Sequence, residues 1–186
     1  MMKKTIFLDR DGVISKYYPG DWTKKWKEFS FLPGVKDALE KLTRANYQIV
    51  IISNQAGVSK GLFGLKALRK ITKRMKEELR KSGGRIKKVY YCPHQDEDNC
   101  SGRKPKVGLF KKAEKDLGYI NFEQTFFVGD SEIDILAGKN IGTKTILVLT
   151  GKIKSKEETK NWQKQLDYVT TDLPSAVEII LNPPSS

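Results

Sequence analysis

Two carboxylates placed two residues apart are the side chains of this protein best suited to chemistry. The apolar run at residues 6–8 ends at Asp9, and Asp11 follows after Arg10. Because side chains alternate along a strand, we expect Asp9 and Asp11 to project to one side and Arg10 to point away. Carboxylates this close repel each other and raise each other's pKa. Such a pair is costly unless it binds a cation or takes part in a phosphate transfer. The pair therefore suits attack on phosphorus assisted by Mg²⁺, although a solvated turn explains the tripeptide alone equally well.

Three further polar clusters follow apolar runs of the kind that form buried strands. In a parallel sheet the carboxyl ends of the strands meet at one edge, which is where ligands bind. Four clusters at equivalent strand ends therefore predict one site, more strongly than any single motif does. The three further clusters are Ser53-Asn54-Gln55, Arg103-Lys104 in the loop after the third strand, and Asp130-Ser131 with Asp134.

Together the clusters supply the parts that phosphoryl transfer needs. We expect Asp9 to attack phosphorus and form an aspartyl-phosphate, and Asp11 to protonate the leaving alcohol and then activate water. His94 is the only histidine, so catalysis by a Ser-His or Cys-His pair is nearly excluded. The binding roles fall to Ser53, Asn54 and Gln55 for the phosphoryl oxygens, Lys104 as a point charge, and Asp130 for Mg²⁺.

The elements that must position these residues alternate between short apolar strands and amphipathic helices. This order predicts an α/β, Rossmann-like fold in which helices cover both faces of a mainly parallel sheet. The clearest helix spans 65–82, where apolar residues recur at spacings of three and four. We expect strands at 5–8, 48–52, 88–91, 125–128, 145–149 and 168–170, and helices at 35–44, 65–82, 107–117, 133–139 and 176–181, with a weaker candidate at 156–165.

The composition points to small anionic substrates more than to nucleic acid. The 186 residues carry a formal net charge of +13, with 28 lysines but only 7 arginines. Arginine is the side chain that binds phosphates and bases in a bidentate manner, so scattered lysines indicate a solvated surface. The chain shows no run long enough to span a membrane and no signal peptide. We therefore expect a cytoplasmic protein that forms one domain over 1–186 and acts as a monomer.

Both cysteines lie near the only histidine, in the segment 92–103. Cys92, His94 and Cys100 are side chains of the kind that bind zinc. Two cysteines in one short loop favour a metal site over a disulfide framework. The alternative is that these side chains pack locally and that backbone hydrogen bonds hold the loop.

The four clusters, in their order, resemble the motifs of the haloacid dehalogenase superfamily of phosphohydrolases over almost the whole chain. Residues 9–12 look like motif I, 52–55 like motif II, 103–105 like motif III and 129–134 like motif IV. Four motifs in order make a specific signal. The resemblance implies a magnesium-dependent phosphatase with the Rossmann-like fold of that superfamily.

The same resemblance implies which residues hold the metal and contact the substrate. In that superfamily the metal is bound by the side chains that match Asp9 and Asp130 and by the backbone carbonyl that matches Asp11, with Asp134 in support. Within it the chain is most similar to subclass III, to the D-glycero-D-manno-heptose 1,7-bisphosphate 7-phosphatases and the histidinol-phosphate phosphatases. In that branch the residue that matches Arg103 contacts the substrate. The leading expectation is removal of the 7-phosphate from the heptose bisphosphate.

The segment 92–103 departs from the pattern of this branch at one position. The relatives complete a zinc site with a Cys-x-Cys pair, and this chain has Gly102 in place of the second cysteine of that pair. A closed tetrahedral site therefore lacks one ligand, which water or a nearby carboxylate could replace, unless the site has decayed. The carboxylate candidates are Asp96, Glu97 and Asp98.

Many members of the superfamily insert a separate cap domain, for which this chain leaves little room. About two dozen residues separate Asp11 from the helix expected at 35–44. We therefore expect an open, capless site rimmed by the substrate-facing segment 15–31 and by 92–103. Aromatic residues in 15–31 most simply pack this loop onto the domain. Its lysines could instead join Arg103 in holding a second phosphate; they are Lys16, Lys24, Lys25 and Lys27.

Three alternatives to a heptose bisphosphate phosphatase stay open. A histidinol-phosphate phosphatase ranks lower because a cationic substrate favours an acidic pocket, whereas the rim is basic. A polynucleotide 3′-phosphatase shares the Arg-Lys-Pro motif, and a basic, aromatic rim suits a nucleic-acid end. A non-catalytic phosphate- or nucleic-acid-binding protein is disfavoured because it would not need Asp9, Asp11 and Asp130 together.

Overall fold

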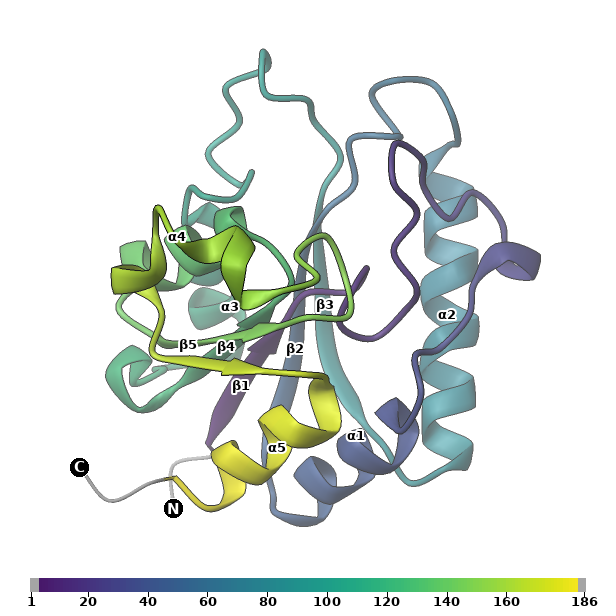
Figure 1. Ribbon diagram of the computed structural model, residues 1–186. Helices are drawn as coiled ribbons and strands as arrows, with labels where there is room; N and C mark the ends of the chain where they lie inside the picture. Colours follow the sequence, from purple (N-terminus) through teal and green to yellow (C-terminus); the bar gives the residue numbers. More distant parts are fainter. Residues whose placement is uncertain (1–3, 184–186) are drawn as a thin grey trace.

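The computed structural model describes residues 4–183 and shows one six-stranded sheet (Figure 1). The strand order is β3-β2-β1-β4-β5-β6, and every neighbouring pair is parallel. This confirms the parallel α/β sheet expected from the sequence. The strands are β1 (Thr5–Leu8), β2 (Gln48–Asn54), β3 (Ile86–Cys92), β4 (Phe126–Gly129), β5 (Lys144–Val148) and β6 (Tyr168–Thr170).

Within residues 4–183, five α-helices cover the two faces of the sheet. Alternation along β1 separates the faces: Ile6 and Leu8 pack in one apolar cluster and Phe7 in another. The first cluster includes residues of α1 (Val35–Arg44), α2 (Leu65–Lys81) and α5 (Leu173–Leu181), and the second includes residues of α3 (Gly108–Leu117) and α4 (Glu132–Ile141). Helices on both faces bury every strand residue of β1, which explains its continuous apolar run.

The central position of β1 brings the polar clusters together. Leu8 lies in register with Ile51 of β2 on one side and with Val128 of β4 on the other. The backbone N–H of Asp9 continues this register by donating to the carbonyl of Val128 at 2.9 Å. The residues that follow the three strands therefore emerge at the same edge of the sheet.

The prediction of a helix at 156–165, the weaker candidate, is wrong. The chain forms two short 3₁₀ helices there, Lys156–Thr159 and Gln163–Gln165. A capping box between Ser155 and Glu158 starts the first one. Trp162, between the two short helices, is buried against Ile135 and Leu147. This packing takes the place of a continuous helix. Smaller differences lie at element ends: β3 begins at Ile86 instead of 88, and α5 begins at Leu173 instead of 176.

Two of the loops at the carboxyl end of the sheet are long and frame the site (Figure 1). The first runs from β1 to α1 and contains one 3₁₀ helix, Trp26–Glu28, and the second joins β3 to α3. Neither loop carries a further domain within residues 4–183, in agreement with the expected capless fold. No helix in this part of the chain is long and apolar enough to cross a membrane.

Candidate active site

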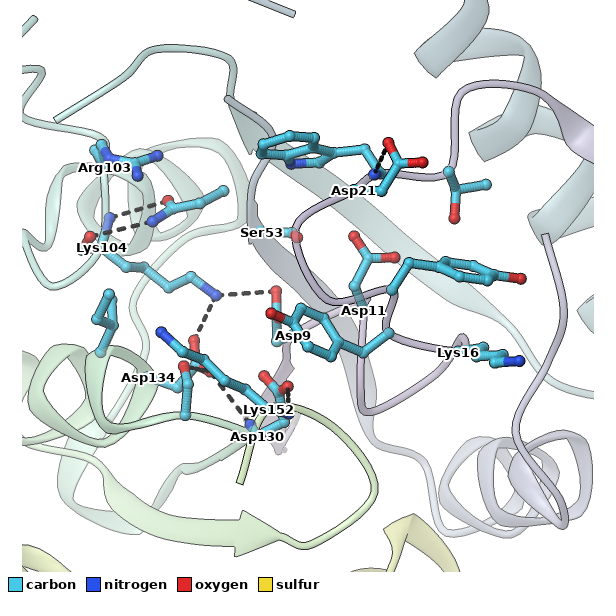
Figure 2. Close-up of a pocket in the computed structure, with 17 residues that line it drawn as sticks. Asp9, Asp11, Lys16, Asp21, Ser53, Arg103, Lys104, Asp130, Asp134 and Lys152 are labelled. Atoms are coloured by element: carbon cyan, nitrogen blue, oxygen red, sulfur yellow. Dashed lines mark hydrogen bonds and ion pairs between the residues drawn. The ribbon is translucent and has the colours of Figure 1, made fainter. Parts of the chain in front are cut away.

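A cavity of about 240 Å³ lies at the carboxyl ends of β1, β2 and β4 (Figure 2). Residues from all four sequence clusters line it, as the sheet order requires. Gln55 is the predicted phosphate-binding residue that lies behind the wall, with its whole side chain buried. The predicted residues that line the cavity are Asp9, Asp11, Ser53, Asn54, Arg103, Lys104, Asp130 and Asp134.

Lys104 connects two of the buried carboxylates. Its Nζ lies 2.9 Å from Oδ1 of Asp9 and 2.6 Å from Oδ1 of Asp134, and it also donates to the carbonyl of Ile52 at 3.0 Å. Burial alone would lower the pKa of this ammonium, but the two carboxylates raise it above its ordinary value. Lys104 is therefore a fixed positive charge beside Asp9.

Gly12 and Gly151 pack so closely against the carboxylate of Asp130 that neither position has room for a Cβ atom. A Cβ atom on Gly12 would lie 2.2 Å from Oδ2 of Asp130, and one on Gly151 would lie 1.9 Å from it. The backbone N–H of Lys152 donates to the same oxygen at 2.6 Å. Burial, and then the charges of Asp134 and Asp9, raise the pKa of Asp130 well above its ordinary value.

The arrangement of the three buried carboxylates fits a hard divalent cation. Carboxylate oxygens of Asp9, Asp130 and Asp134 lie within 4.8 Å of one another, and one ammonium, Lys104, leaves two negative charges uncompensated. Asp134 is already engaged by Lys104, by the Ser131 hydroxyl at 2.6 Å and by the Asp130 N–H at 3.2 Å. Burial raises the pKa of Asp9 to about 6, although Lys104 opposes the shift. Asp9 and Asp130 have fewer partners, because Lys104 contacts one oxygen of Asp9 and the Lys152 N–H contacts one oxygen of Asp130. Each of these two carboxylates therefore keeps an oxygen for a cation such as Mg²⁺.

One oxygen of Asp9 is short of hydrogen-bond donors. Within residues 4–183, Oδ1 of Asp9 is buried and accepts no hydrogen bond of good geometry, although Lys104 Nζ lies at ion-pair distance. The Lys104 ammonium compensates the charge of this oxygen, but the remaining lone pairs of a buried carboxylate still need partners. This observation favours a ligand or a reacting atom next to Asp9.

Asp11 is held by three side chains, and this corrects two expectations. Arg10 does not point away: it is fully buried, and its Nε and Nη2 donate to the two oxygens of Asp11 at 3.0 and 2.7 Å. Gln55 Nε2 and Ser15 Oγ donate to the same carboxylate at 2.8 and 2.9 Å. Burial would raise the pKa of Asp11, but Arg10 and these hydrogen bonds hold it below its ordinary value. The expectation that the two carboxylates raise each other's pKa therefore holds only for Asp9, whose pKa is raised mainly by burial and then by the charges of Asp134 and Asp11.

Asn54 joins two of the clusters. Its amide donates to the backbone carbonyl of Lys104 and accepts from the backbone N–H of the same residue, both at 3.1 Å. The side chain of Ser53 is buried, and its hydroxyl accepts from Gln55 Nε2 at 3.3 Å. Asn54 thus fixes the loop that carries Lys104, while Ser53 and Asn54 both line the cavity.

The basic rim differs in detail from the expectation. Arg103 donates to both carboxylate oxygens of Asp96, at 2.6 and 3.0 Å, and to the carbonyl of His94 at 2.9 Å. Lys24 pairs with Asp21 and Lys25 with Glu28. Of the four lysines proposed in the segment 15–31, Lys16 lines the cavity; Lys24, Lys25 and Lys27 are not among the lining residues.

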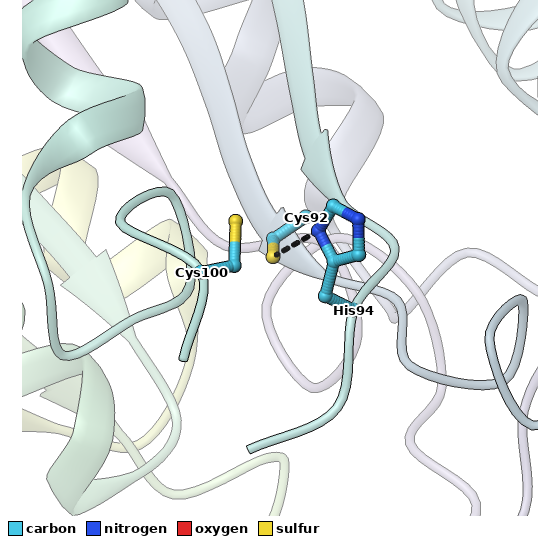
Figure 3. A group of neighbouring side chains, drawn as sticks. All are labelled: Cys92, His94 and Cys100. Atoms are coloured by element: carbon cyan, nitrogen blue, oxygen red, sulfur yellow. Dashed lines mark hydrogen bonds between the residues drawn. The ribbon is translucent and has the colours of Figure 1, made fainter. Parts of the chain in front are cut away.

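The three potential zinc ligands lie together (Figure 3). One ligand atom from each of Cys92, His94 and Cys100 falls within 4.8 Å of the other two, and Cys92 Sγ lies 3.8 Å from His94 Nδ1. Within residues 4–183 no carboxylate joins this group. Two of the acidic candidates have other partners: Asp96 binds Arg103, and Asp98 accepts from the Gln95 N–H at 2.8 Å. The donor set fits a soft divalent cation with one coordination position left open.

Two residues at the site differ from what the sequence predicts. Strict alternation along the strand places Arg10 on the far side, but β1 ends at Leu8 and Arg10 is bound to Asp11 behind the cavity. Lys152 lines the cavity from the loop after β5, where no motif marks it among 28 lysines. The one available signal was Thr150-Gly151, a pair of small residues directly after an apolar strand.

Comparisons with known proteins show which family of proteins this chain resembles. The family model described as polynucleotide kinase 3 phosphatase matches residues 2–182. The D-glycero-beta-D-manno-heptose-1,7-bisphosphate 7-phosphatase of Pasteurella multocida is 36% identical over 187 residues, covering 95% of this chain and 98% of the relative. The enzyme of the same name from Neisseria meningitidis serogroup A is 39% identical over 153 residues, covering 81% and 80%.

A solved structure extends the likeness to three dimensions. The D,D-heptose 1,7-bisphosphate phosphatase from B. bronchiseptica, in complex with magnesium and phosphate, superimposes with a TM-score of 0.89 at 31% identity. The superposition covers 96% of this chain and 98% of that chain. This chain therefore belongs to the haloacid dehalogenase superfamily of phosphatases, in the family that the polynucleotide kinase 3 phosphatase model describes and to which the heptose bisphosphate phosphatases are related.

Proposed function

We propose that this phosphatase is a magnesium-dependent phosphomonoesterase that removes the 7-phosphate of D-glycero-D-manno-heptose 1,7-bisphosphate. The observation that carries the chemistry is the pairing of Asp9, buried and short of hydrogen-bond donors, with the fixed charge of Lys104. Relatives that carry this name at up to 39% identity support this choice of substrate. Lys16, Arg103 and Lys152 line the cavity and support an anionic substrate.

Asp9 is the proposed nucleophile. Its carboxylate oxygen attacks phosphorus, the bond from phosphorus to the sugar oxygen breaks, and the leaving oxygen takes a proton from Asp11. Water then attacks the phosphorus of the aspartyl-phosphate and gives a proton to Asp11, which releases inorganic phosphate and restores the Asp9 carboxylate and the protonated Asp11. Lys104 holds Asp9 in place and stabilises the negative charge on the phosphoryl group throughout.

Asp11 must change its protonation state for this role. In the structure Arg10, Gln55 and Ser15 stabilise its charged form. A phosphate dianion in the cavity places like charge beside Asp11, which raises its pKa and favours the protonated form that the first step needs. The three partners also keep the carboxylate aimed at the cavity, so we assign them a positioning role.

The proposed metal ligands are the side chains of Asp9 and Asp130 and the backbone carbonyl of Asp11. When bound there, Mg²⁺ would offset the excess negative charge and polarise the phosphoryl oxygens. Asp134 supports the site by orienting Lys104 and the turn at Asp130. Ser53 and Asn54 complete the wall at which the phosphoryl group binds, with Gln55 behind them.

We also propose that the enzyme is a monomer formed by one domain. The segment 15–31 contributes Tyr17, Tyr18 and Trp22 to the cavity, where their rings can cover the apolar side of a sugar. Arg103 would contact the substrate from the segment 92–103, in which Cys92, His94 and Cys100 would hold zinc as a structural ion. This ion would hold the carbonyl of His94, and therefore Arg103, in place.

A polynucleotide 3′-phosphatase is the second candidate, favoured by the family model and by the net charge of +13. Phosphate release with Mg²⁺ from heptose 1,7-bisphosphate, histidinol phosphate and a 3′-phosphorylated oligonucleotide separates the candidates. Asp9→Asn serves as the blank. We expect strong preference for the bisphosphate and no release in the variant. Activity confined to the oligonucleotide or to histidinol phosphate would overturn the proposed substrate, and full activity in the variant would overturn the proposed nucleophile.

A further inference from the structure

The loop after β5 forms a wall of the cavity and is fastened to both metal-binding turns. The Thr150 hydroxyl donates to the carbonyl of Gly12 at 2.6 Å. The N–H of Lys152 donates to Oδ2 of Asp130 at 2.6 Å, and the N–H of Ile153 donates to the carbonyl of Asp130 at 3.1 Å. These bonds fix the backbone of Lys152 relative to Gly12 and Asp130, which lie next to the proposed nucleophile Asp9.

The side chain of Lys152 reaches the cavity as an uncompensated cation. It lines the cavity and is exposed, and Figure 2 shows it beside Asp130, on the side of the cavity away from Lys16. Its amine forms no ion pair or hydrogen bond with any residue between 4 and 183, whereas its backbone N–H is bonded to Asp130. A fixed backbone with a free ammonium suits the binding of an anion that arrives with the substrate.

The other cations around the cavity already have partners. Lys104 lies between Asp9 and Asp134, and Arg103 is bidentate to Asp96. The amine of Lys16 lies 5.3 Å from the ring centroid of Tyr18, in cation–π geometry. Among the cations that line the cavity, Lys152 is thus the one whose charge the described residues leave least compensated.

We propose that Lys152 binds the second phosphate of the substrate, the one that is not transferred, and so determines the preference for a bisphosphate over a monophosphate. This inference rests on the proposed function and adds the residue that recognises the substrate class. Arg103 binds the substrate from the opposite loop, and Lys152 does so from the β5 loop. A substrate held at both ends places only one of its phosphates against Asp9.

The test compares kcat/KM for heptose 1,7-bisphosphate with kcat/KM for heptose 7-phosphate, which lacks the second phosphate. The ratio of the two values isolates recognition of that phosphate. Lys152→Gln should lower the ratio about tenfold, the effect of losing one charge-assisted hydrogen bond, mainly through KM for the bisphosphate. Lys152→Arg should keep most of the ratio because it keeps the charge. Lys156→Gln, which removes an exposed lysine from the same segment, should leave the ratio unchanged.

Each other outcome overturns a defined part of the inference. An unchanged ratio in Lys152→Gln, with circular dichroism showing a folded protein, overturns the role of Lys152. A fall in the ratio in Lys16→Gln alone assigns the second phosphate to the segment 15–31. A wild-type enzyme without preference for the bisphosphate contradicts the proposed substrate itself, and the role of Lys152 with it. A preference for the bisphosphate that is present in the wild type and unchanged in Lys152→Gln keeps the proposed substrate and overturns only the assignment of Lys152 to its second phosphate.

Discussion

At the scale of single residues, Asp9 lies where burial and like charge both oppose ionisation. Its side chain is buried beside Asp130 and Asp134, and burial raises its pKa to about 6. An active site often keeps such an arrangement at the expense of stability, because the unfavourable charge is the one that the reaction uses. Asparagine has nearly the same shape without the charge, so it separates the two effects.

We expect Asp9→Asn to lower phosphate release by about 10⁴-fold or more. Without metal, its free energy of unfolding should stay within about 1 kcal/mol of the wild-type value or exceed it, because lost repulsion offsets the lost ion pair with Lys104. Urea denaturation in EDTA and in Mg²⁺ measures this. Mg²⁺ should stabilise the wild type and the control Asp37→Asn, an exposed position, more than Asp9→Asn. Equal stabilisation of all three proteins by Mg²⁺ would remove Asp9 from the metal site.

At the scale of elements, the turn after β1 depends on Gly12 for two reasons. Its φ of +85° is one that residues with a Cβ atom rarely adopt, and a Cβ atom there would collide with the carboxylate of Asp130. The two requirements can be separated, because Gly142 has a φ of +90° at the end of α4 with no described atom within 4 Å of its Cβ position.

Gly12→Ala should therefore lower phosphate release by about 100-fold or more, because a displacement of Asp130 by an ångström disturbs the proposed metal site. Gly142→Ala carries the backbone strain alone and should cost about 1 kcal/mol of unfolding free energy while keeping its activity. Phosphate release and urea denaturation of both variants give the comparison. Similar losses of activity in the two variants would mean that backbone strain, not contact with Asp130, is what matters at Gly12.

The segment 92–103 allows the zinc proposal to be tested by gain of function. A Cβ atom on Gly102 would lie 3.7 Å from Cys100 Sγ and 3.3 Å from a flexible leucine, Leu109, so a side chain fits with small adjustments. Gly102→Cys should restore the fourth ligand and raise zinc affinity by about 100-fold or more, whereas Gly102→Ser adds similar volume without a thiolate. Competition with a chromophoric chelator measures the affinities. Equal affinities in all three proteins would show that residue 102 lies outside the coordination sphere.

Asp167 joins α4, β5 and the segment that leads into β6. Lys139 donates to both of its oxygens at 2.7 Å, and the N–H and hydroxyl of Thr145 donate at 2.7 and 2.9 Å. Burial would raise the pKa of Asp167, but Lys139 and Thr145 hold it below the ordinary value of 3.8. A carboxyl whose pKa is lower in the folded state contributes stability above its unfolded pKa.

Asp167→Asn should therefore be about 1 kcal/mol less stable than the wild type at neutral pH, a value reduced by partial exposure of the group. The difference should stay constant down to about pH 4 and then shrink as the pH falls through the lowered pKa of Asp167. Urea denaturation of both proteins across this range provides the measurement. A difference that grows on acidification would contradict the assignment.

At the scale of the whole molecule, the sequence predicted the architecture and most of the cavity for a physical reason. Both follow from periodic burial and from the rule that polar strand ends meet at one edge of a parallel sheet. The prediction of a helix at 156–165 is wrong because tertiary packing, which buries Trp162, outweighs the local helix propensity of this segment. The pairing of Arg10 with Asp11 and Gln55 also depends on tertiary proximity, since Gln55 is 45 residues away. Lys152 acquires its position only through the fold of the β5 loop.

The molecule combines a basic surface with an acidic cavity, and this contrast bears on its ligands. The formal charge is +13, yet the buried carboxylates around Asp9 outnumber the buried ammonium. Cations gather elsewhere as well, in a groove of about 800 Å³ between α2 and β3 that shares no lining residue with the cavity at Asp9. The basic residues of this groove are Arg69, Lys73, Lys76, Arg80 and Arg85.

Such a surface should bind nucleic acid by charge alone. We expect an unphosphorylated oligonucleotide to bind with a Kd of about 10⁻⁴ to 10⁻⁶ M at physiological salt, and more weakly as salt rises. Because the groove and the cavity are separate, this binding should not compete with phosphate release from the sugar bisphosphate. Fluorescence anisotropy over a KCl series, with phosphate release measured in parallel, tests both statements. Competitive inhibition by the oligonucleotide would place nucleic acid in the cavity at Asp9 and make the polynucleotide substrate the better explanation of the charge.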